Sequence, residues 1–242
     1  MPLPLAPSLT VVVPVYNERA NLLRVTGELL SVLRTACRDF EILLVDDGST
    51  DGAFVGGAPA ELPGARELRV IAHGQNRGLT AALRTGFFGA DRELVTWVPA
   101  DGQIPAGELA KILDAWRGED LVLSTYRHRP DGAVRAAMSL GLRALLRVGA
   151  GLRDRLEGPY LFRRALLDDL GLVARTSAGS IGFEIAAKLR RDGRAIATTE
   201  IECAPRLSGR SKVANARNIA ATLGEIWRIG QSVRARPRTP RR

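Results

Sequence analysis

Short apolar runs alternate along the chain with segments in which apolar residues recur at every third or fourth position. The runs, rich in β-branched residues, are typical of strands buried on both faces, and the periodic segments are typical of amphipathic helices. This alternation predicts an α/β fold, with a mostly parallel sheet flanked by helices and joined by right-handed crossovers. We expect strands at residues 9–15, 40–45, 68–72, 94–98, 121–124 and 195–203, helices at 22–33, 78–90, 106–116, 136–148, 180–191 and 213–233, and a loop at 53–67.

Positive charge is concentrated after residue 205. Residues 206–242 hold ten Lys or Arg and one acid, Glu225, whereas the preceding residues hold 25 basic and 25 acidic side chains, so the net charge of +9 belongs to this segment. We expect one domain over residues 1–212, followed by an amphipathic helix and a partly disordered basic tail over 213–242. A basic arm on a neutral domain suits an anionic membrane surface or nucleic acid, and nucleic acid is the weaker alternative because no base-reading element accompanies the tail.

The helix expected at 136–148 places Arg143 and Arg147 opposite its apolar residues. Two alternatives follow: the helix packs against the domain, or it lies in a membrane interface. No apolar run reaches the roughly 18 residues that would span a bilayer. Cys37 and Cys203 have neither metal-site nor disulfide spacing, which indicates a reducing compartment. We therefore expect a cytoplasmic protein that is peripheral on the inner face of the cell membrane.

Three predicted strands end in polar clusters, at residues 16–18, 46–49 and 101–103. The carboxyl ends of parallel strands meet at one edge of a sheet, where these carboxylates would repel one another unless a cation were bound. Mg²⁺ or Mn²⁺ takes carboxylate and amide oxygens and completes its shell with water and substrate phosphate oxygens. The pattern predicts a nucleotide-diphosphate site with a divalent metal. No glycine-rich P-loop or dinucleotide fingerprint follows the first strand, which disfavours NTP hydrolysis and hydride transfer.

Eight ordered segments between residues 8 and 212 carry a resemblance to a known family. They read VVVPVYNE (11–18), EILLVDDGSTDG (41–52), QNRGLTAALRTGF (75–87), PADGQ (99–103), DLVLSTYRHR (120–129), DRLEGPYLFRR (154–164), GFE (182–184) and PRLSGRSK (205–212). Together they resemble family 2 glycosyltransferases with a Rossmann-like GT-A fold, and most of all the polyprenyl-phosphate branch of the dolichyl-phosphate mannose synthase type.

The resemblance implies roles for particular residues. The base and ribose of the sugar nucleotide would be held by Pro14, Tyr16, Glu18 and Asp46. The metal would be bound by Asp101 and Gln103. The donor diphosphate or the acceptor phosphate would be clamped by Arg206, Ser211 and Lys212. The catalytic acids would be Asp101, Asp154 and Glu184, of which the last two would lie near the acceptor.

Two positions depart from the family pattern. The first Asp of the usual D-x-D metal motif is here Pro99, which has neither a carboxylate nor an N–H group. The segment after Asp154 that usually reads Gly-Phe is here Gly158-Pro159, which stiffens a loop near the acceptor. Altered donor choice, a weaker metal requirement and lost activity are the alternatives that follow.

The favoured hypothesis is an inverting, metal-assisted glycosyltransferase that moves a sugar from a UDP- or GDP-linked donor to a polyprenyl phosphate. The first alternative is a soluble transferase with a hydroxyl acceptor, in which Asp154 or Glu184 would accept the proton. The second is a homologue that binds nucleotide sugars without catalysis, because of Pro99.

Some polar residues also have simpler structural interpretations. Asp47 and Asp51 are expected to form turns, because Asp-Gly turns need them. Glu184, implied to be catalytic, has a solvated surface charge as its alternative interpretation. His73 and His128 show no partner spacing and are expected to be incidental rather than catalytic.

Overall fold

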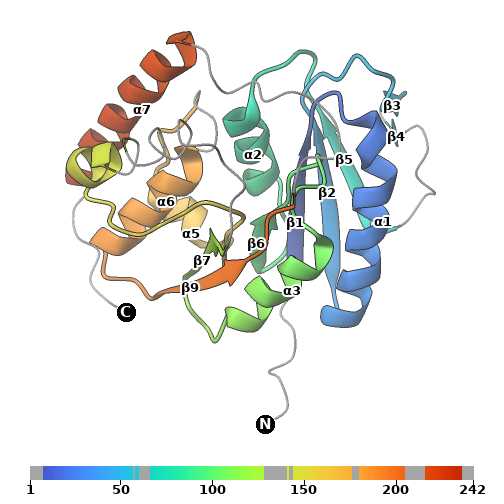
Figure 1. Ribbon diagram of the computed structural model, residues 1–242, viewed down its shortest axis with the longest axis horizontal. Coiled ribbons are helices and arrows are strands. Elements are labelled where there is room, and N and C mark those ends of the chain that lie inside the picture. The colour runs from blue at the N-terminus through green and yellow to red at the C-terminus, as the bar shows by residue number, and fades with distance from the viewer. Residues whose placement is uncertain are drawn as a thin grey trace.

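The protein is known from a computed structural model that describes residues 8–56, 58–59, 66–127, 141, 144–175, 180–204 and 216–235. Its centre is a seven-stranded sheet in the order β5-β2-β1-β6-β8-β7-β9 (Figure 1). The strands are β1 Leu9–Val15, β2 Phe40–Asp46, β5 Leu68–Ala72, β6 Leu94–Trp97, β7 Leu121–Tyr126, β8 Leu161–Arg163 and β9 Ile196–Ile201. All pairings are parallel except those of β8, which runs antiparallel to β6 and β7. The predicted α/β fold with a mostly parallel sheet is confirmed.

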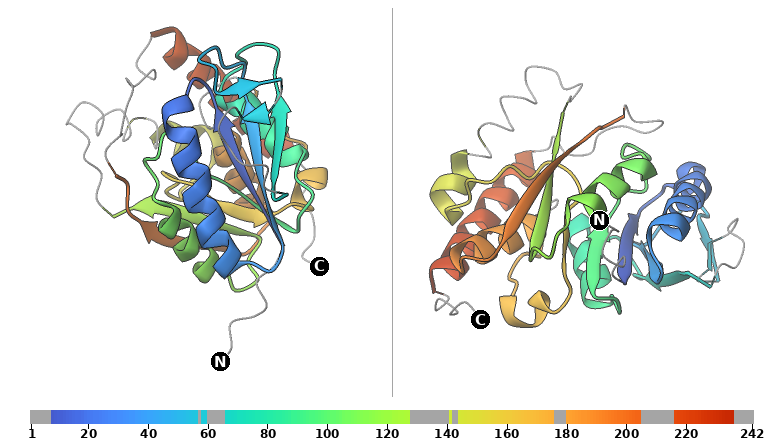
Figure 2. Two further views of the ribbon diagram at one scale, coloured as in Figure 1. Left: turned by 90° about the vertical axis from the view of Figure 1, so that its right-hand side faces the viewer. Right: turned by 90° about the horizontal axis from the view of Figure 1, so that it is seen from below.

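Helices cover both faces of this sheet. They are α1 Arg19–Ala36, α2 Leu79–Phe88, α3 Ala106–Ala115, α5 Leu166–Leu170, α6 Ser180–Arg191 and α7 Ala216–Ala235. Val11 and Val13 face the core shared with α1 and α3, whereas Val12 between them faces α2, α6 and α7. This alternation is what a strand with period-two side chains requires. Figure 2 shows α6 and α7 together at one end of the molecule, away from α1. None of the described helices is long and apolar enough to cross a membrane.

Four short elements were not predicted from the sequence. The expected loop at 53–67 contains a small hairpin of β3 Phe54–Val55 and β4 Ala58–Pro59, so that prediction is wrong at these residues. Strand β8 and helix α5 were also missed. Such short segments carry too few positions for a period of 2 or 3.6 to emerge.

Helix α7 packs on the same core as the rest of the sheet. Ile226, Ile229 and Val233 are buried against the residues of α6. Close contact is possible because Gly230 lies on the backbone of Gly149, where an added Cβ would approach the Gly149 carbonyl oxygen to 2.1 Å. Residues 205–215 lie outside the described part, so the domain boundary at 212 stays a prediction.

The helix expected at 136–148 is described at residues 141 and 144–150, and these are helical. Leu146 is 4% exposed and belongs to the core, whereas Leu145 is 44% and Val148 is 85% exposed. The helix therefore packs against the domain along one side and presents apolar residues to solvent along another.

Gly86 allows α2 to lie directly on the sheet. A Cβ added at Gly86 would lie 2.2 Å from Val12 Cγ1, whereas nothing lies within 4 Å of a Cβ added at Gly27 in α1. We expect Gly86→Ala to lower the free energy of unfolding by about 1–3 kcal/mol, because α2 must move off β1. Gly27→Ala is the control and should be neutral or stabilise by about 0.5–1 kcal/mol. Urea unfolding compares the two, and equal effects would contradict this packing.

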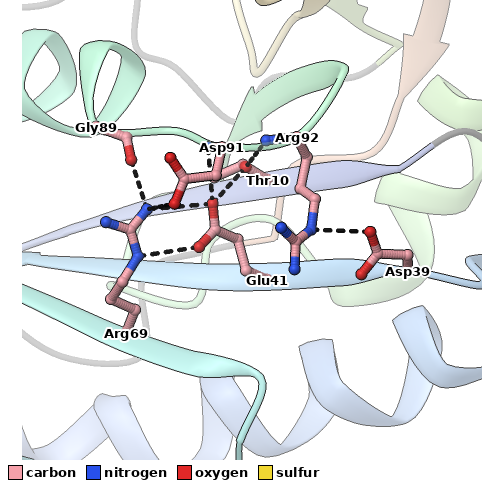
Figure 3. Close-up of polar contacts among 7 residues, drawn as sticks. All are labelled: Thr10, Asp39, Glu41, Arg69, Gly89, Asp91 and Arg92. Atoms are coloured by element: carbon pink, nitrogen blue, oxygen red, sulfur yellow. Dashed lines mark hydrogen bonds and ion pairs between the residues drawn. The ribbon is translucent and has the colours of Figure 1, made fainter.

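A polar network joins the strands at the amino edge of the sheet, opposite the predicted site (Figure 3). Glu41 is 7% exposed and accepts hydrogen bonds from the Thr10 hydroxyl at 2.7 Å and from the Asp91 N–H at 3.1 Å. Arg69 Nε donates to Glu41 Oε2 at 3.0 Å. Burial alone would raise the pKa of Glu41, but the bonds from Arg69, Thr10 and Asp91 outweigh it and hold that pKa below its ordinary value.

Glu41→Gln should lower the free energy of unfolding by about 2–3 kcal/mol at pH 7, because it breaks this ion pair. The value is below the roughly 3–5 kcal/mol typical of fully buried pairs because the Arg69 side chain is 38% exposed. Since the folded pKa is the lower one, the wild-type contribution is complete above about pH 4.3 and is lost as pH falls through the folded value. Urea unfolding at pH 7 and pH 3 should show a difference between wild type and variant that shrinks in acid. Glu28→Gln, at an exposed pair with Arg24, is the control and should change the free energy of unfolding little at either pH. A loss of stability in Glu41→Gln that is equal at both pH values would contradict the account.

Candidate active site at the carboxyl edge of the sheet

Two loops interlock where β1 and β2 end. β1 and β2 are in register, with Val15 opposite Asp46. Asn17, the one described non-glycine residue with positive φ (56°), accepts a hydrogen bond from the Thr50 N–H at 2.7 Å. Its own N–H donates to Ser49 Oγ at 3.1 Å. This exchange holds the segment after β1 against the segment after β2.

The four predicted donor-binding residues lie at these two strand ends. Pro14 is in β1, and Tyr16 and Glu18 follow it, all of them half-buried. Asp46 is 8% exposed, and its Oδ1 accepts the Ser49 N–H at 2.8 Å, which turns the loop back over the strand. Pro14, Tyr16, Glu18 and Asp46 are therefore brought together, and their contacts with a nucleotide stay a prediction.

Asp47 organises the neighbouring loop after β5. Its side chain is 4% exposed, and it accepts hydrogen bonds from the N–H groups of Arg77 at 2.9 Å and Gly78 at 2.8 Å. His73 Nδ1 lies 2.7 Å from Asp47 Oδ1, and His73 Nε2 lies 2.9 Å from the Thr85 hydroxyl. The turn-forming role expected of Asp47 fits this geometry. His73 bridges the loop after β2 to helix α2, which is a structural role, and His128 lies outside the described residues.

Gly48 lets these two loops touch. Its φ of +75° lies in the left-handed region, and an added Cβ would be 2.6 Å from the backbone carbon of Gln75. Asp51 holds the loop after β2 against the start of α1, because its Oδ2 accepts the Arg19 N–H at 2.8 Å. The ends of β1 and β2 thus form a set of backbone turns held by the carboxylates of Asp46, Asp47 and Asp51.

Asp101 and Gln103 lie beside the end of β1. Strand β6 pairs with β1 up to Trp97, and the Val98 N–H then donates to the Val12 carbonyl oxygen at 2.9 Å. Asp101 Oδ1 accepts the Gln103 N–H at 3.1 Å, which closes a tight turn. The Gln103 carbonyl oxygen accepts the Ala204 N–H at 2.8 Å, so the chain after β9 leaves from beside this turn. The predicted phosphate-binding residues that follow, Arg206, Ser211 and Lys212, lie outside the described residues.

The oxygen donors available at this turn fit a metal that is shared with a substrate. Among the described residues, no group of three or more His, Cys, Asp or Glu side chains is placed to hold a metal ion by itself. Mg²⁺ commonly uses one or two carboxylates and takes its other oxygens from water and substrate phosphates. Asp101 and Gln103 match this limited protein contribution, and Pro99 beside them adds no side-chain ligand.

Asp154 is held by helix α6 rather than by the residues around Asp101. Arg190 Nε donates to Asp154 Oδ2 at 3.0 Å, and a second Arg190 nitrogen pairs with Oδ1. The hydrogen bond to Asp154 raises the pKa of Arg190 above its ordinary value. Both carboxylate oxygens are thus engaged, which suits positioning better than proton removal. Within the described residues, no hydrogen bond or ion pair joins Asp154 to Asp101.

Glu184 is buried, which excludes the solvated surface charge considered for it. It is 0% exposed and accepts hydrogen bonds from the N–H groups of Val173 and Ala174 at 2.7–2.9 Å. Lys188, one turn later in α6 and 1% exposed, donates to Glu184 Oε1 at 2.5 Å. The geometry favours a positioning role for the loop before α6, and contact of Glu184 with an acceptor stays a prediction.

Glu157 is a carboxylate at the carboxyl edge that sequence reasoning missed. It accepts the Tyr126 N–H at 3.1 Å where β7 ends, and its side chain is 13% exposed. Arg155 pairs with its other oxygen at 3.1 Å. Its position in the DRLEGPY segment could have identified it, because it directly precedes Gly158-Pro159, where the sequence departs from the family pattern.

The order and spacing of these edge residues match a known sequence family. The family described as glycosyl transferase family 2 matches residues 10–181, which include β1, the 46–52 loop and the Asp101 turn. The chain belongs to glycosyl transferase family 2. It is therefore a glycosyltransferase, and its sheet with flanking helices is the GT-A fold.

Curated relatives include enzymes named for lipid-phosphate acceptors. Polyprenol monophosphomannose synthase of Mycolicibacterium smegmatis is 29% identical over 93% of this chain and 89% of its own length. Undecaprenyl-phosphate 4-deoxy-4-formamido-L-arabinose transferases are 33% identical in Aeromonas hydrophila and 41% identical in Pseudomonas paraeruginosa. These matches cover 66% and 52% of this chain, which spans about half or less (50% and 38%) of the length of those two relatives.

Solved structures share the fold at low sequence identity. Glucosyl-3-phosphoglycerate synthase of Mycobacterium tuberculosis, in complex with Mn²⁺, UDP-glucose and phosphoglyceric acid, has a TM-score of 0.63 at 20% identity, over 96% of this chain and 81% of its own. Mannosyl-3-phosphoglycerate synthase of Rubrobacter xylanophilus has a TM-score of 0.60 at 18% identity, over 97% and 78%. At such identities the likeness establishes the fold alone.

Proposed function

We propose that this glycosyltransferase moves a sugar from a nucleotide-diphosphate donor to the phosphate of a polyprenyl phosphate. The observation that carries the proposal is the convergence of Tyr16, Glu18, Asp46 and the Asp101–Gln103 turn at one edge of the sheet. Ligands bind at this edge in open α/β folds. The polyprenyl-phosphate acceptors named for the curated relatives support the choice of acceptor.

The donor would lie across the ends of β1 and β2, with its diphosphate toward the Asp101 turn. Asp101 and Gln103 would hold Mg²⁺ or Mn²⁺, which neutralises charge on the departing diphosphate when it is bound. Arg206, Ser211 and Lys212 are proposed to bind phosphate from the chain that leaves beside Gln103. Metal complexes of structural neighbours with UDP support this arrangement.

The reaction is a single inverting displacement. An oxygen of the acceptor phosphate attacks the anomeric carbon, the new C–O bond forms, and the bond to the donor diphosphate breaks with its electron pair. The attacking phosphate is already an anion near neutral pH, so no residue has to remove a proton. Asp154, held by Arg190, and Glu157, held at the end of β7, then position the acceptor side of the site.

A thermal-shift panel of UDP- and GDP-linked sugars, each with and without Mn²⁺, tests the donor half of the proposal. Ligand binding to the folded state raises the melting temperature by mass action. We expect either the UDP-linked or the GDP-linked sugars to raise the melting temperature more than the other group. Mn²⁺ should increase that rise. A panel in which no nucleotide sugar shifts the melting temperature at millimolar concentration would overturn the proposal.

A hydroxyl acceptor is the second candidate, favoured by the phosphoglycerate named for structural neighbours. That reaction needs a base, and its rate would fall in acid as a carboxylate becomes protonated. The pH–rate profiles of the wild type, Asp154→Asn and Glu157→Gln separate the two candidates. A fall in the wild-type rate at low pH that disappears in either variant favours a hydroxyl acceptor. A wild-type rate that shows no such fall favours a phosphate acceptor.

An apolar patch on α7 and the neighbouring helical segment suits a peripheral membrane contact, which we propose for this protein. The patch consists of Leu145, Val148, Leu223 and Trp227, which are 44%, 85%, 44% and 63% exposed. Its two parts are adjacent, because Arg234 on α7 donates to the Gly149 carbonyl oxygen at 2.7 Å. Exposed Trp beside basic residues is typical of surfaces that enter the interface of an anionic bilayer.

We expect Val148→Asp and Trp227→Asp to reduce binding to anionic liposomes about tenfold or more each, because a carboxylate is repelled by the surface and removes apolar contact. Val55→Asp is the control, since Val55 is 67% exposed on the distant β3. Liposome sedimentation at low salt measures the difference. Unchanged binding of both patch variants would contradict this orientation.

A further inference from the structure

A hollow on the outer face of α2 has a lining that the proposed reaction does not use. Its volume is about 370 Å³, and it is lined by Arg77, Ala81, Arg84, Thr85, Phe88 and Arg175. Five of these residues follow the spacing of one helix face, from the turn before α2 to its last residue. Arg175 comes from the segment before α6, on the other side of the hollow. Asp101 and Gln103 are not among its lining residues.

The hollow gathers three guanidinium groups without a lining carboxylate. Some other described arginines on the surface have an acid partner, as in the Arg163–Glu93 pair at 2.8 Å. Within the described part of the chain, no ion pair joins an acid to Arg77, Arg84 or Arg175. Like charges around one concave site repel one another, and a bound anion relieves that repulsion.

Arg84 is fixed in place before any ligand binds. Its NH1 donates to the Leu172 carbonyl oxygen at 3.1 Å, and its guanidinium lies 4.8 Å from the centre of the Phe88 ring. A guanidinium held in this way keeps its remaining N–H groups in a planar fork, which matches the oxygens of a phosphate. Ala81 and the 39% exposed Phe88 add an apolar side to the hollow.

We propose that this hollow binds a phosphate monoester, at a site that does not include the Asp101–Gln103 turn. The arginines take the phosphate oxygens, and Phe88 contacts the organic part. The volume is within the range of small-molecule sites. The phosphate could belong to a soluble phosphorylated metabolite or to the headgroup of phosphatidic acid, since both present a phosphate monoester to the arginines.

The first test uses inorganic phosphate as the probe, on the full chain, at constant ionic strength and with EDTA present. We expect a saturable rise in melting temperature for the wild type. The double variant Arg77→Gln/Arg175→Gln should raise the apparent Kd for phosphate about tenfold or more, as expected when charged hydrogen bonds are lost. Both side chains are exposed and make no described hydrogen bond, so the variant should keep the wild-type melting temperature in chloride.

Two controls separate this site from other anion binding. Arg38→Gln removes a charge from an exposed arginine outside the hollow and should leave the phosphate affinity unchanged. Asp101→Asn should also leave it unchanged, because Asp101 does not line the hollow. Phosphate binding that never saturates, or that is equal in the wild type and the double variant, would overturn the proposal whatever the outcome for nucleotide sugars.

Vesicles distinguish the two sources of the phosphate. Vesicles of phosphatidylcholine with phosphatidic acid are compared with phosphatidylcholine alone, after the loss of phosphate binding in the double variant is established. Loss of sedimentation in the double variant supports a lipid headgroup, and unchanged sedimentation supports a soluble phosphate ester.

Discussion

Asp101→Asn is expected to reduce sugar transfer about a hundredfold or more while the protein stays folded. Asp101 is the carboxylate of the turn beside β1, and Pro99 cannot replace it as a ligand. Asparagine keeps the oxygen that accepts the Gln103 N–H but removes the charge that attracts a divalent cation. Since stabilisation of a leaving diphosphate by a metal contributes several kcal/mol, its loss should appear mainly in kcat.

Two measurements make this prediction specific. Asp114→Asn changes the same side chain at an exposed position of α3 and should leave activity unchanged. In thermal-shift experiments, Asp101→Asn should lose the part of the nucleotide-sugar shift that depends on Mn²⁺ and keep the part that does not. Full transfer by Asp101→Asn would show that the metal is held elsewhere.

Glu184→Gln is expected to lower the free energy of unfolding by about 3–5 kcal/mol, because it leaves Lys188 buried without a counter-charge. Glu184 is 0% and Lys188 is 1% exposed. The carboxylate also holds the N–H groups of Val173 and Ala174, which an amide nitrogen cannot do. Sugar-transfer activity should fall in proportion to the fraction of folded protein, because the substitution acts on stability and not on the reaction.

A double-mutant cycle separates the ion pair from the rest of this network. Lys188→Met combined with Glu184→Gln should cost less than the sum of the two single changes, because no unpaired charge remains. Glu200→Gln is the control, since Glu200 pairs with Arg127 at the surface and is 61% exposed. A fully folded Glu184→Gln protein without turnover would instead support the catalytic role implied by the family motif.

The long elements of this fold were predictable because their side-chain periods extend over several turns or pleats. The strands at 9–15 and 68–72 and the helix at 180–191 lie at the expected residues. The antiparallel β8 was not predictable, because it has three residues and its pairing depends on the path of the chain after β7. Sequence periodicity carries no information about such long-range pairing.

The site was predictable to the extent that it consists of strand ends. Asp46 and Asp101 follow buried runs, and parallel strands bring such positions to one edge. The contact of His73 with Asp47 depends on β5 lying beside β2, which the order of elements along the chain does not reveal. The spacing of Glu184 and Lys188 is equally typical of an exposed helical pair, and their burial results from the loop at 170–174.

Transfer of labelled sugar to a lipid phosphate tests the central claim most directly. The full chain is incubated with Mn²⁺, undecaprenyl phosphate in detergent, and the sugar-labelled nucleotide that gave the largest thermal shift. The account predicts label in the organic phase, one nucleoside diphosphate released for each labelled lipid, and loss of both in Asp101→Asn. Donor consumption with all label remaining in water-soluble products would contradict it.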